Sequence, residues 1–208
     1  MKQKILGLAI LTLCLVASCK SDKKETESKV EETSTEVETM TKTPSVTDKK
    51  EKPAHFSDKR KMTMRLEPKS GSNASGSIVF KQEDGIVTMI AVFSGLTPGE
   101  HAIHIHEKAD CSADDGTSSG GHWNPTAQPH GKWGDEKGYH KGDIGNFVAD
   151  ENGHGTITKI TDEWCIGCDD TNKNILGKAI IVHQGADDFT SQPSGAAGAR
   201  VSCGGIIE

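Results

Sequence analysis

Two histidines separated by a single residue, His104 and His106, have a spacing that suits metal binding. On a β-strand, residues i and i+2 point to the same face of the sheet. Both imidazole rings would therefore approach one point in space from a rigid backbone. Because imidazole suits copper and zinc as a ligand, the pair predicts part of a tightly held metal site.

Further candidate ligands follow along the chain. They are His122, His130, His140, Asp143 and His183. The chain has nine histidines, and a lone histidine is more often a packed or exposed side chain than a ligand. We interpret His55 and His154 in that way, because one stands in a polar segment and the other beside a turn.

Six histidines and one aspartate are too many ligands for a single tetrahedral ion. They suit two ions that share one ligand. An imidazole can lose its second ring proton and bridge two cations, because the charge of the cations stabilises the anion. The set therefore predicts a two-metal centre, with the aspartate oxygen completing a zinc site.

The segments that must position these ligands have the pattern of β-strands. Apolar residues recur with a period of two, and no convincing long helix is present. Short strands are expected at residues 61–66, 76–81, 86–93, 102–106, 144–149, 155–160, 178–183 and 199–203. Turn residues separate several of them, as in Glu83-Asp84-Gly85. Eight short strands at this density predict an all-β sandwich or closed barrel.

Two segments between the expected strands are long for loops in a compact domain. They cover residues 107–143 and 184–199. Long ordered loops are usually functional. All candidate ligands lie within these loops or at the strand ends beside them, so we expect the two loops to build the site.

Five blocks of the chain resemble copper–zinc superoxide dismutase. They are residues 95–107 (GLTPGEHAIHIHE), 121–125 (GHWNP), 140–146 (HKGDIGN), 183–188 (HQGADD) and 198–204 (GARVSCG). The blocks occur in the order of that family, and the resemblance runs from about Lys61 to the C-terminus. It implies an eight-stranded antiparallel Greek-key barrel with two long functional loops.

The resemblance also implies a role for each candidate ligand. The residues fall into three groups: His104, His106 and His183 for copper, His122 as the bridge between two ions, and His130, His140 and Asp143 for zinc. One copper ion and one zinc ion per chain are the implied cofactors.

Three further residues take their expected roles from the same resemblance. Asp187 would link a copper-ligand ring to a zinc-ligand ring, between His104 and His130, and so fix their orientation. Arg200 would stand over the copper, and with His122 it forms the expected catalytic pair. His101 would be a buried structural histidine.

The implied activity is dismutation of superoxide to oxygen and hydrogen peroxide by a redox-cycling copper, bridged through His122 to a structural zinc. The alternative is a lipoprotein that sequesters copper or zinc on the same fold without turnover. A sequestering protein needs neither Arg200 nor a bridging histidine. The complete set therefore favours the enzyme.

Of the two cysteine pairs, one matches the family pattern and the other does not. Cys111 and Cys203 correspond to the intrachain disulfide of the family. Cys165 and Cys168 depart from the family pattern. A local disulfide is our first interpretation of this pair, with a free thiol pair or a further metal site as alternatives.

The start of the 208-residue chain has the pattern of an export signal. Lys2 and Lys4 precede an apolar run, 5–17, which is shorter than the roughly 20 residues needed to span a bilayer. The run leads into LVASC, ending at Cys19, which resembles the lipobox of bacterial lipoproteins. Residues 1–18 are thus the expected signal peptide and Cys19 the expected lipidation site. A plain secreted protein with a chance cysteine is the alternative.

Residues 19–57 are almost entirely polar and cannot bury enough apolar surface to offset their ordering entropy. We expect a disordered tether there, followed by one superoxide dismutase domain at 58–208. Apolar residues in the tether are too sparse for an amphipathic helix.

The expected location is outside the cytoplasm, on a membrane-anchored lipoprotein that faces the periplasm or the cell surface. Loss of Lys2 and Lys4 with the signal would lower the formal net charge from −6 to −8. This acidic balance argues against a nucleic-acid partner. The expected partners are superoxide and, through Cys19, a membrane, while a homodimer stays possible.

Overall fold

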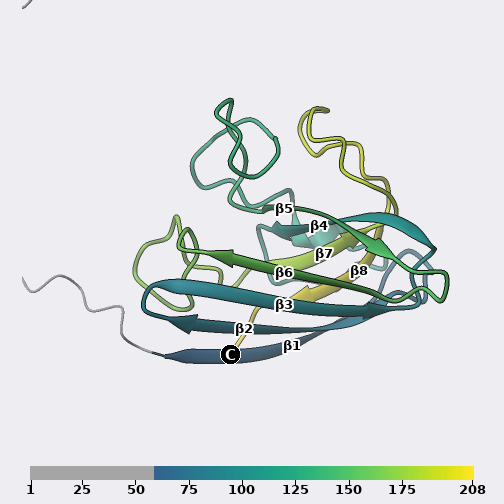
Figure 1. The fold of residues 1–208 in the computed structure, drawn as a ribbon, viewed down its shortest axis with the longest axis horizontal. Coiled ribbons are helices and arrows are strands. Elements are labelled where there is room, and N and C mark those ends of the chain that lie inside the picture. The colour runs from purple at the N-terminus through teal and green to yellow at the C-terminus, as the bar shows by residue number, and fades with distance from the viewer. Residues whose placement is uncertain (1–58) are drawn as a thin grey trace, which may run out of the picture. The chain divides into compact units, whose positions relative to one another are not determined.

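Eight antiparallel strands form a closed barrel in a computed structural model that describes residues 59–208 (Figure 1). The strands are β1 (Arg60–Pro68), β2 (Ser75–Glu83), β3 (Ile86–Ser94), β4 (Gly99–His106), β5 (Asp143–Ala149), β6 (Gly155–Thr161), β7 (Ala179–His183) and β8 (Arg200–Gly205). The expected signal peptide, Cys19 and the tether lie outside the described residues. None of the helices in the described part of the chain is long and apolar enough to cross a membrane.

The eight predicted strands are confirmed, and their ends differ from the prediction by three residues at most. Around the barrel the order is β1-β2-β3-β6-β5-β4-β7-β8. The connections from β3 to β4 and from β6 to β7 each pass over two strands, which makes a Greek-key arrangement. The predicted hairpin turn between β2 and β3 has φ values of 51° at Asp84 and 77° at Gly85, as the turn favoured in tight hairpins requires.

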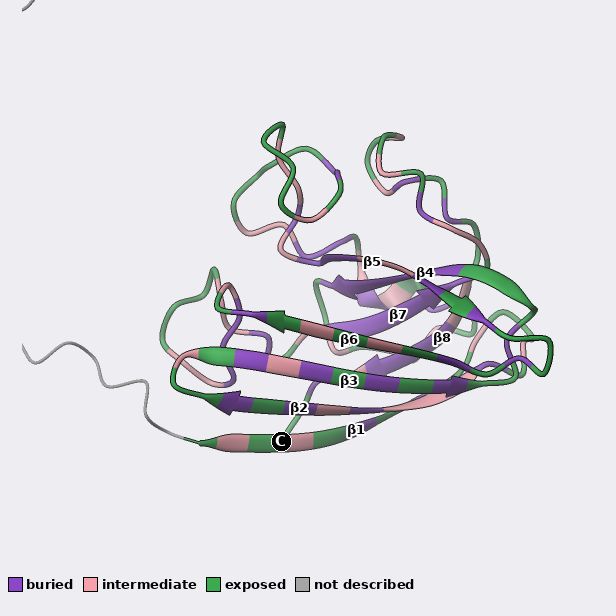
Figure 2. Ribbon diagram, viewed as in Figure 1, coloured by how far each residue is buried: buried purple, intermediate pink, exposed green. Residues whose placement is uncertain are grey.

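The barrel interior holds the main apolar core. On β3, the alternate residues Val87, Met89, Ala91 and Phe93 are buried, and the residues between them point outward (Figure 2). This alternation is the period-two pattern that the sequence carries. It gives the barrel a rigid wall on which the site can be built.

Two strands, β4 and β7, are buried on both faces. Ile103 and Ile105 of β4 belong to the interior core, whereas His104 and His106 point to the outer face and are also buried. All five residues of β7 are buried. The cover is provided by the long loop (residues 107–142) and the second loop (residues 184–199), which join β4 to β5 and β7 to β8.

The long loop is attached to β4 through backbone hydrogen bonds. The Ile105 N–H donates to the Gly142 carbonyl at 2.9 Å, and the Trp123 N–H donates to the Ile105 carbonyl at 2.8 Å. A β-carbon at Gly142 would collide with the Ile105 carbonyl oxygen, so only glycine permits this approach. The attachment brings residues 122 and 123 beside β4.

Candidate metal centre

Four histidines from three parts of the fold form the first ligand group. The donor atoms lie within 4.8 Å of one another on His104, His106, His122 and His183. The first two histidines are on the outer face of β4, and His183 ends β7. The long loop supplies His122, which forms an isolated antiparallel bridge with His106. All four side chains are buried.

The second ligand group shares one member with the first. It consists of His122, His130, His140 and Asp143, whose donor atoms again lie within 4.8 Å of one another. Asp143 begins β5 and lies opposite His104 in the sheet register. The structure thus brings together all seven ligands that the sequence singled out, with His122 belonging to both groups.

The ring nitrogens show that these groups suit metal ions. Each of the six histidines has one buried nitrogen without a hydrogen-bond partner: Nδ1 of His104, His130 and His140, and Nε2 of His106, His122 and His183. An unsatisfied buried polar atom costs about 1–3 kcal/mol. Six such atoms converging on two points, with one carboxylate, form the donor set that copper and zinc accept.

Hydrogen bonds at the opposite ring nitrogens hold most of these rings in place. His106 Nδ1 donates to the Gly120 carbonyl at 2.9 Å, and His183 Nδ1 donates to the Gly198 carbonyl at 3.3 Å. A proton fixed at one nitrogen leaves the lone pair of the other free for a cation. The backbone of the two loops therefore selects the tautomer that metal binding needs.

Asp187 connects the two ligand groups. Its Oδ2 accepts from His104 Nε2 at 2.9 Å, and its Oδ1 accepts from His130 Nε2 at 2.8 Å. Asp187 therefore lies between the two rings that the family resemblance indicated. Gly195 covers this bridge with φ of 72°, and a β-carbon there would collide with the Asp187 carboxylate.

Two side chains that support the centre had no role in the sequence interpretation. Asn146 Oδ1 accepts from the Asp187 N–H at 2.8 Å, and Asn146 Nδ2 donates to the Asp187 carbonyl at 2.9 Å. Gln192 makes a similar pair of bonds to the backbone of His130, at 2.9 and 2.8 Å. Asn146 lies in the HKGDIGN block, which was a usable signal, whereas nothing in the sequence around Gln192 indicates its contact.

Burial keeps several of the histidines neutral. It lowers the pKa of His106 to about 2, of His183 to about 3 and of His122 to about 4. A neutral imidazole has a lone pair to offer, so these three rings are ready to bind a cation at neutral pH.

At the second ligand group, contacts between histidines and aspartates favour the charged forms of both. Burial alone would lower the pKa of His130, but the nearby carboxylates of Asp143 and Asp187 outweigh burial and raise this pKa to about 9. Burial alone would raise the pKa of Asp143, but its hydrogen bond to His122 and its close contacts with His130 and His140 hold that pKa well below its usual range. Burial alone would also raise the pKa of Asp187, but its hydrogen bonds to His104 and His130 outweigh burial and lower it. Both aspartates are thus anionic at neutral pH, and they complement a cation at the second ligand group.

Arg200 is the cation next to the first ligand group. It lies opposite His183 in the register of β7 and β8 and is half-buried. Its Nη1 donates to the Gly116 carbonyl at 2.8 Å and to Ser119 Oγ at 3.0 Å. Burial lowers the pKa of Arg200, but arginine keeps its charge in proteins.

A cavity of about 440 Å³ gives access to this part of the centre. Its lining includes Arg200, His106, His122 and His183. A small anion that enters would meet the guanidinium and the first ligand group together.

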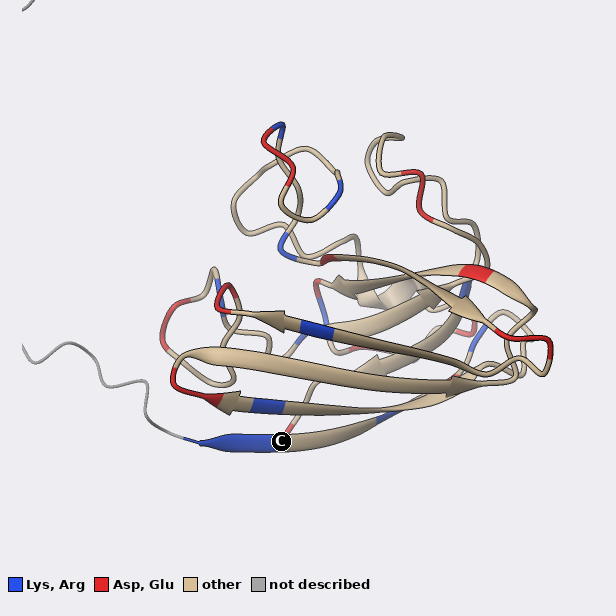
Figure 3. Cartoon of the chain, in the orientation of Figure 1, with Lys and Arg blue, Asp and Glu red and all other residues tan. Residues whose placement is uncertain are grey.

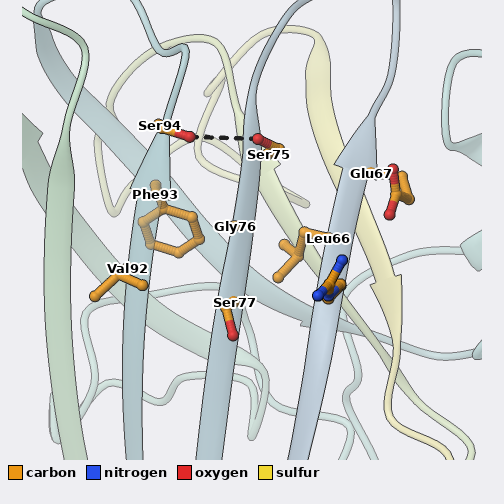
Figure 4. A pocket seen from close by; sticks show the side chains of 9 residues that line it. Leu66, Glu67, Ser75, Gly76, Ser77, Val92, Phe93 and Ser94 are labelled. Carbon is orange, nitrogen blue, oxygen red and sulfur yellow. Dashed lines mark hydrogen bonds between the residues drawn. The ribbon is translucent and has the colours of Figure 1, made fainter.

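A larger hollow, of about 510 Å³, lies elsewhere on the barrel, across β1, β2 and β3 (Figure 4). Its lining includes Leu66, Gly76 and Phe93, with Ser75 and Ser94 hydrogen-bonded at its edge. It contains none of the candidate site residues.

Two disulfides are present in the described part of the chain. Cys111–Cys203 joins the long loop to β8, three residues after Arg200. Cys165–Cys168 closes a short turn between β6 and β7. Among the alternatives that the sequence left open for the second pair, the structure has the local disulfide.

Comparisons with known proteins agree with this architecture. A family model for copper/zinc superoxide dismutase matches residues 74–206. A double mutant of a SOD-like protein from Bacillus subtilis is 32% identical, with a TM-score of 0.63 over 70% of this chain and 97% of that chain. A SOD-like protein from the same organism is 31% identical, with a TM-score of 0.62 and the same coverage. The clock protein EA4 is 35% identical, with a TM-score of 0.60 over 71% of this chain and 94% of that chain.

Proposed function

Because the chain belongs to the copper/zinc superoxide dismutase family, we propose that it converts two superoxide anions and two protons into oxygen and hydrogen peroxide. One observation carries the proposal: His122 belongs to both ligand groups. Its Nδ1 faces Asp143 at 2.8 Å, and its Nε2 is buried without a partner on the side of the other histidines. That arrangement suits a bridge between two different ions.

The ligands divide between the two ions. His104, His106 and His183 would hold copper together with His122, while His130, His140 and Asp143 would hold zinc together with the same ring. Copper supplies a one-electron redox couple, and zinc in a site with no open position supplies structure and positive charge.

Arg200 attracts and orients the substrate. Superoxide is an anion, and the guanidinium is held at the cavity wall by the Gly116 carbonyl and Ser119. A fixed cation in a partly buried cavity acts more strongly than the same charge in water. The residue therefore concentrates the anion beside the histidines.

His122 can hold a proton at Nε2 whenever that nitrogen carries no cation. The side chain lines the cavity, so the proton is within reach of a reduced oxygen species there. Asp143 lies 2.8 Å from the opposite nitrogen, and the two would hold zinc together, which keeps the ring oriented during this exchange.

Metal analysis and turnover on the full chain test this proposal together. We expect one copper and one zinc per chain by mass spectrometry, and fast superoxide decay by pulse radiolysis. Arg200→Ala should keep both metals and slow the decay by about tenfold or more, whereas His122→Ala should lose turnover and disturb binding of both ions. Bound metals with wild-type decay no faster than in Arg200→Ala would favour the sequestering alternative.

We also propose that the domain works outside the cytoplasm and is anchored through Cys19. Two disulfides support an oxidising compartment, and the sequence before residue 20 supports the anchor. In cells, Cys19→Ser should abolish incorporation of a labelled fatty acid and release the protein from the membrane fraction. Retention of the label would contradict the assignment.

A further inference from the structure

The β6–β7 loop (residues 162–178) holds the part of the long loop that carries His140. Trp164 Nε1 donates to the Lys141 carbonyl at 2.9 Å. Glu163 accepts from the Tyr139 hydroxyl at 2.6 Å and forms an ion pair with the Lys141 ammonium group. These contacts lie on both sides of His140, so the β6–β7 loop fixes the backbone at that ligand.

An aromatic contact also joins the β6–β7 loop to the long loop, and we call this set of contacts the junction. The rings of Trp133 and Trp164 meet edge to face with centroids 5.5 Å apart. Trp133 is in the long loop, three residues after His130, and Trp164 is almost fully buried. The junction between the loops therefore depends on Trp164 keeping its position.

The residue after Trp164 is one half of the local disulfide. Cys165 is buried, and its backbone pairs with the far side of the loop: its N–H donates to the Lys173 carbonyl at 2.8 Å, and its carbonyl accepts from the Ile175 N–H at 3.0 Å. Cys168 is half-buried on the outer part of the turn. Cys168 is thus the more accessible of the two cysteines, and Cys165 is adjacent to Trp164.

The two disulfides differ in their packing and in the length of chain that each one closes. Cys203 lies within β8 and packs against Ala179 and Ile181, and its disulfide spans 92 residues of sequence. The Cys165–Cys168 disulfide spans only three, so it restricts the unfolded chain much less. It also lies outside the barrel strands, so neither of its cysteines takes part in the strand pairing of the barrel.

We propose that Cys165–Cys168 is a thiol–disulfide exchange site through which a dithiol reductant controls how firmly the centre holds zinc. The inference rests on the proposed function in one respect, the assignment of His122, His130, His140 and Asp143 to zinc. Reduction frees the turn next to Trp164 and weakens the contacts of Glu163 and Trp164 with Tyr139 and Lys141, the two neighbours of His140. Zinc then dissociates faster.

The exchange proceeds in two balanced steps. A thiolate of the reductant attacks Cys168 Sγ and forms a mixed disulfide, while the bond to Cys165 breaks and Cys165 leaves as a thiolate that takes a proton. The second thiol of the reductant, as its thiolate, then attacks the reductant sulfur in the mixed disulfide and releases Cys168. Two electrons pass to the protein, and the reductant ends as its own disulfide.

Zinc release from the full chain tests the inference. Zinc-loaded protein is incubated with increasing dithiothreitol, thiols are located by alkylation and mass spectrometry, and released zinc is measured with a chromogenic chelator that does not bind through thiols. We expect Cys165 and Cys168 to be alkylated before Cys111 and Cys203, and zinc release to accelerate about tenfold at that stage. Reduction of this pair without faster release would overturn the inference, as would earlier reduction of Cys111–Cys203.

Variants separate the disulfide from general loss of structure. Cys165→Ser with Cys168→Ser should release zinc at the fast rate without reductant, and Trp164→Phe should do the same with its disulfide intact. Asp169→Asn, in the same turn, should behave as the wild type. A double variant with the slow wild-type rate would contradict the inference, and far-ultraviolet circular dichroism checks that each variant is folded.

The dismutase proposal is tested by a separate measurement, superoxide turnover, on the same samples. Absence of superoxide turnover in copper- and zinc-loaded protein would refute that proposal and would leave the zinc-release result unaffected. Absence of stoichiometric zinc in the starting protein would instead refute the ligand assignment on which the inference rests.

Discussion

Ser119 helps to position the Arg200 guanidinium, although no motif in the sequence singles it out. The side chain is fully buried, its hydroxyl donates to the Gly116 carbonyl at 2.9 Å, and the same oxygen accepts from Arg200 at 3.0 Å. The guanidinium is therefore held by one carbonyl and one hydroxyl. Removal of the hydroxyl leaves a single fixed partner and a more mobile charge.

We expect Ser119→Ala to lower kcat/KM for superoxide about tenfold, because a hydrogen bond to a charged group contributes about 1.5–3 kcal/mol. Affinity for azide, a small anion used as a probe of the cavity, should weaken in parallel, while copper and zinc content stay unchanged. Thr117→Ala, whose hydroxyl bonds only to exposed Asp115, is the matched control. Loss of metal from Ser119→Ala would show a structural role instead.

Protonation of Glu163 in acid should weaken the contacts between the β6–β7 loop and the long loop. Burial alone would raise its pKa, but its bonds to Lys141 and Tyr139 outweigh burial and lower this pKa below the usual 4.5. A carboxyl group with a lowered folded-state pKa stabilises the fold above its unfolded pKa. That contribution is lost as the pH falls below about 4.5, towards the folded value.

In the metal-free protein, Glu163→Gln should reduce the free energy of unfolding at pH 7, and the difference from the wild type should shrink as the pH falls below about 4.5. Urea denaturation at a series of pH values measures it. Asp143 and Asp187 also lose stabilisation in acid, but they are common to both proteins and cancel in the difference. A difference that stays constant down to pH 3 would contradict the prediction.

Strands were predictable because each carries a period-two pattern or a set of ligands. On β3 the alternation of Val87, Met89 and Ala91 with outward residues defines the strand by itself. On β4 both faces are buried, so the apolar pattern is weak there, and the spacing of His104 and His106 located the strand instead. Both cases follow from residues that are close together in the sequence.

Loop structure was not predictable in the same way. Gln192 bonds to the backbone of His130, 62 residues away, and Trp164 bonds to the backbone of Lys141, 23 residues away. A side chain that reaches a distant main-chain atom leaves no periodic pattern and no motif. Histidine spacing indicated the candidate ligands and the family resemblance assigned their roles, whereas the contacts that hold those ligands required the three-dimensional structure.

Of the two disulfides in the described residues, Cys111–Cys203 closes the longer loop. It closes a loop with a sequence separation of 92 and joins the long loop to β8. In the chain-entropy model such a closure contributes about 4–5 kcal/mol to stability. We expect the double variant Cys111→Ser, Cys203→Ser to lose about that much free energy of unfolding in urea, and a loss under about 1 kcal/mol would contradict the model.

Few charged side chains lie around the entrance to the centre. The second loop has Asp187 and Asp188 near its start and no charged residue from 189 to 199 (Figure 3). Among the lysines of the long loop, Lys141 is paired with Glu163 and is not free to attract an anion. Attraction of superoxide from a distance therefore depends on few charges.

We expect kcat/KM to change by less than about twofold between 10 and 150 mM salt, a range over which the Debye length shortens from about 30 to 8 Å. Thr190→Lys, at an exposed site in the second loop, should raise the rate at low salt and introduce a salt dependence. Thr190→Gln is the uncharged control. A steep fall of the wild-type rate with salt would contradict the prediction.

The candidate ligands of the centre extend along the chain from His104 to His183 and come from three strands and the long loop. An unfolded polypeptide cannot gather them, so neither ion can be carried through a membrane by a chain that crosses it unfolded. If the domain is exported in that form, it must acquire copper and zinc at its destination. The activity of a cell's pool of this protein would then follow the metal supply of that outer compartment and not that of the cytoplasm.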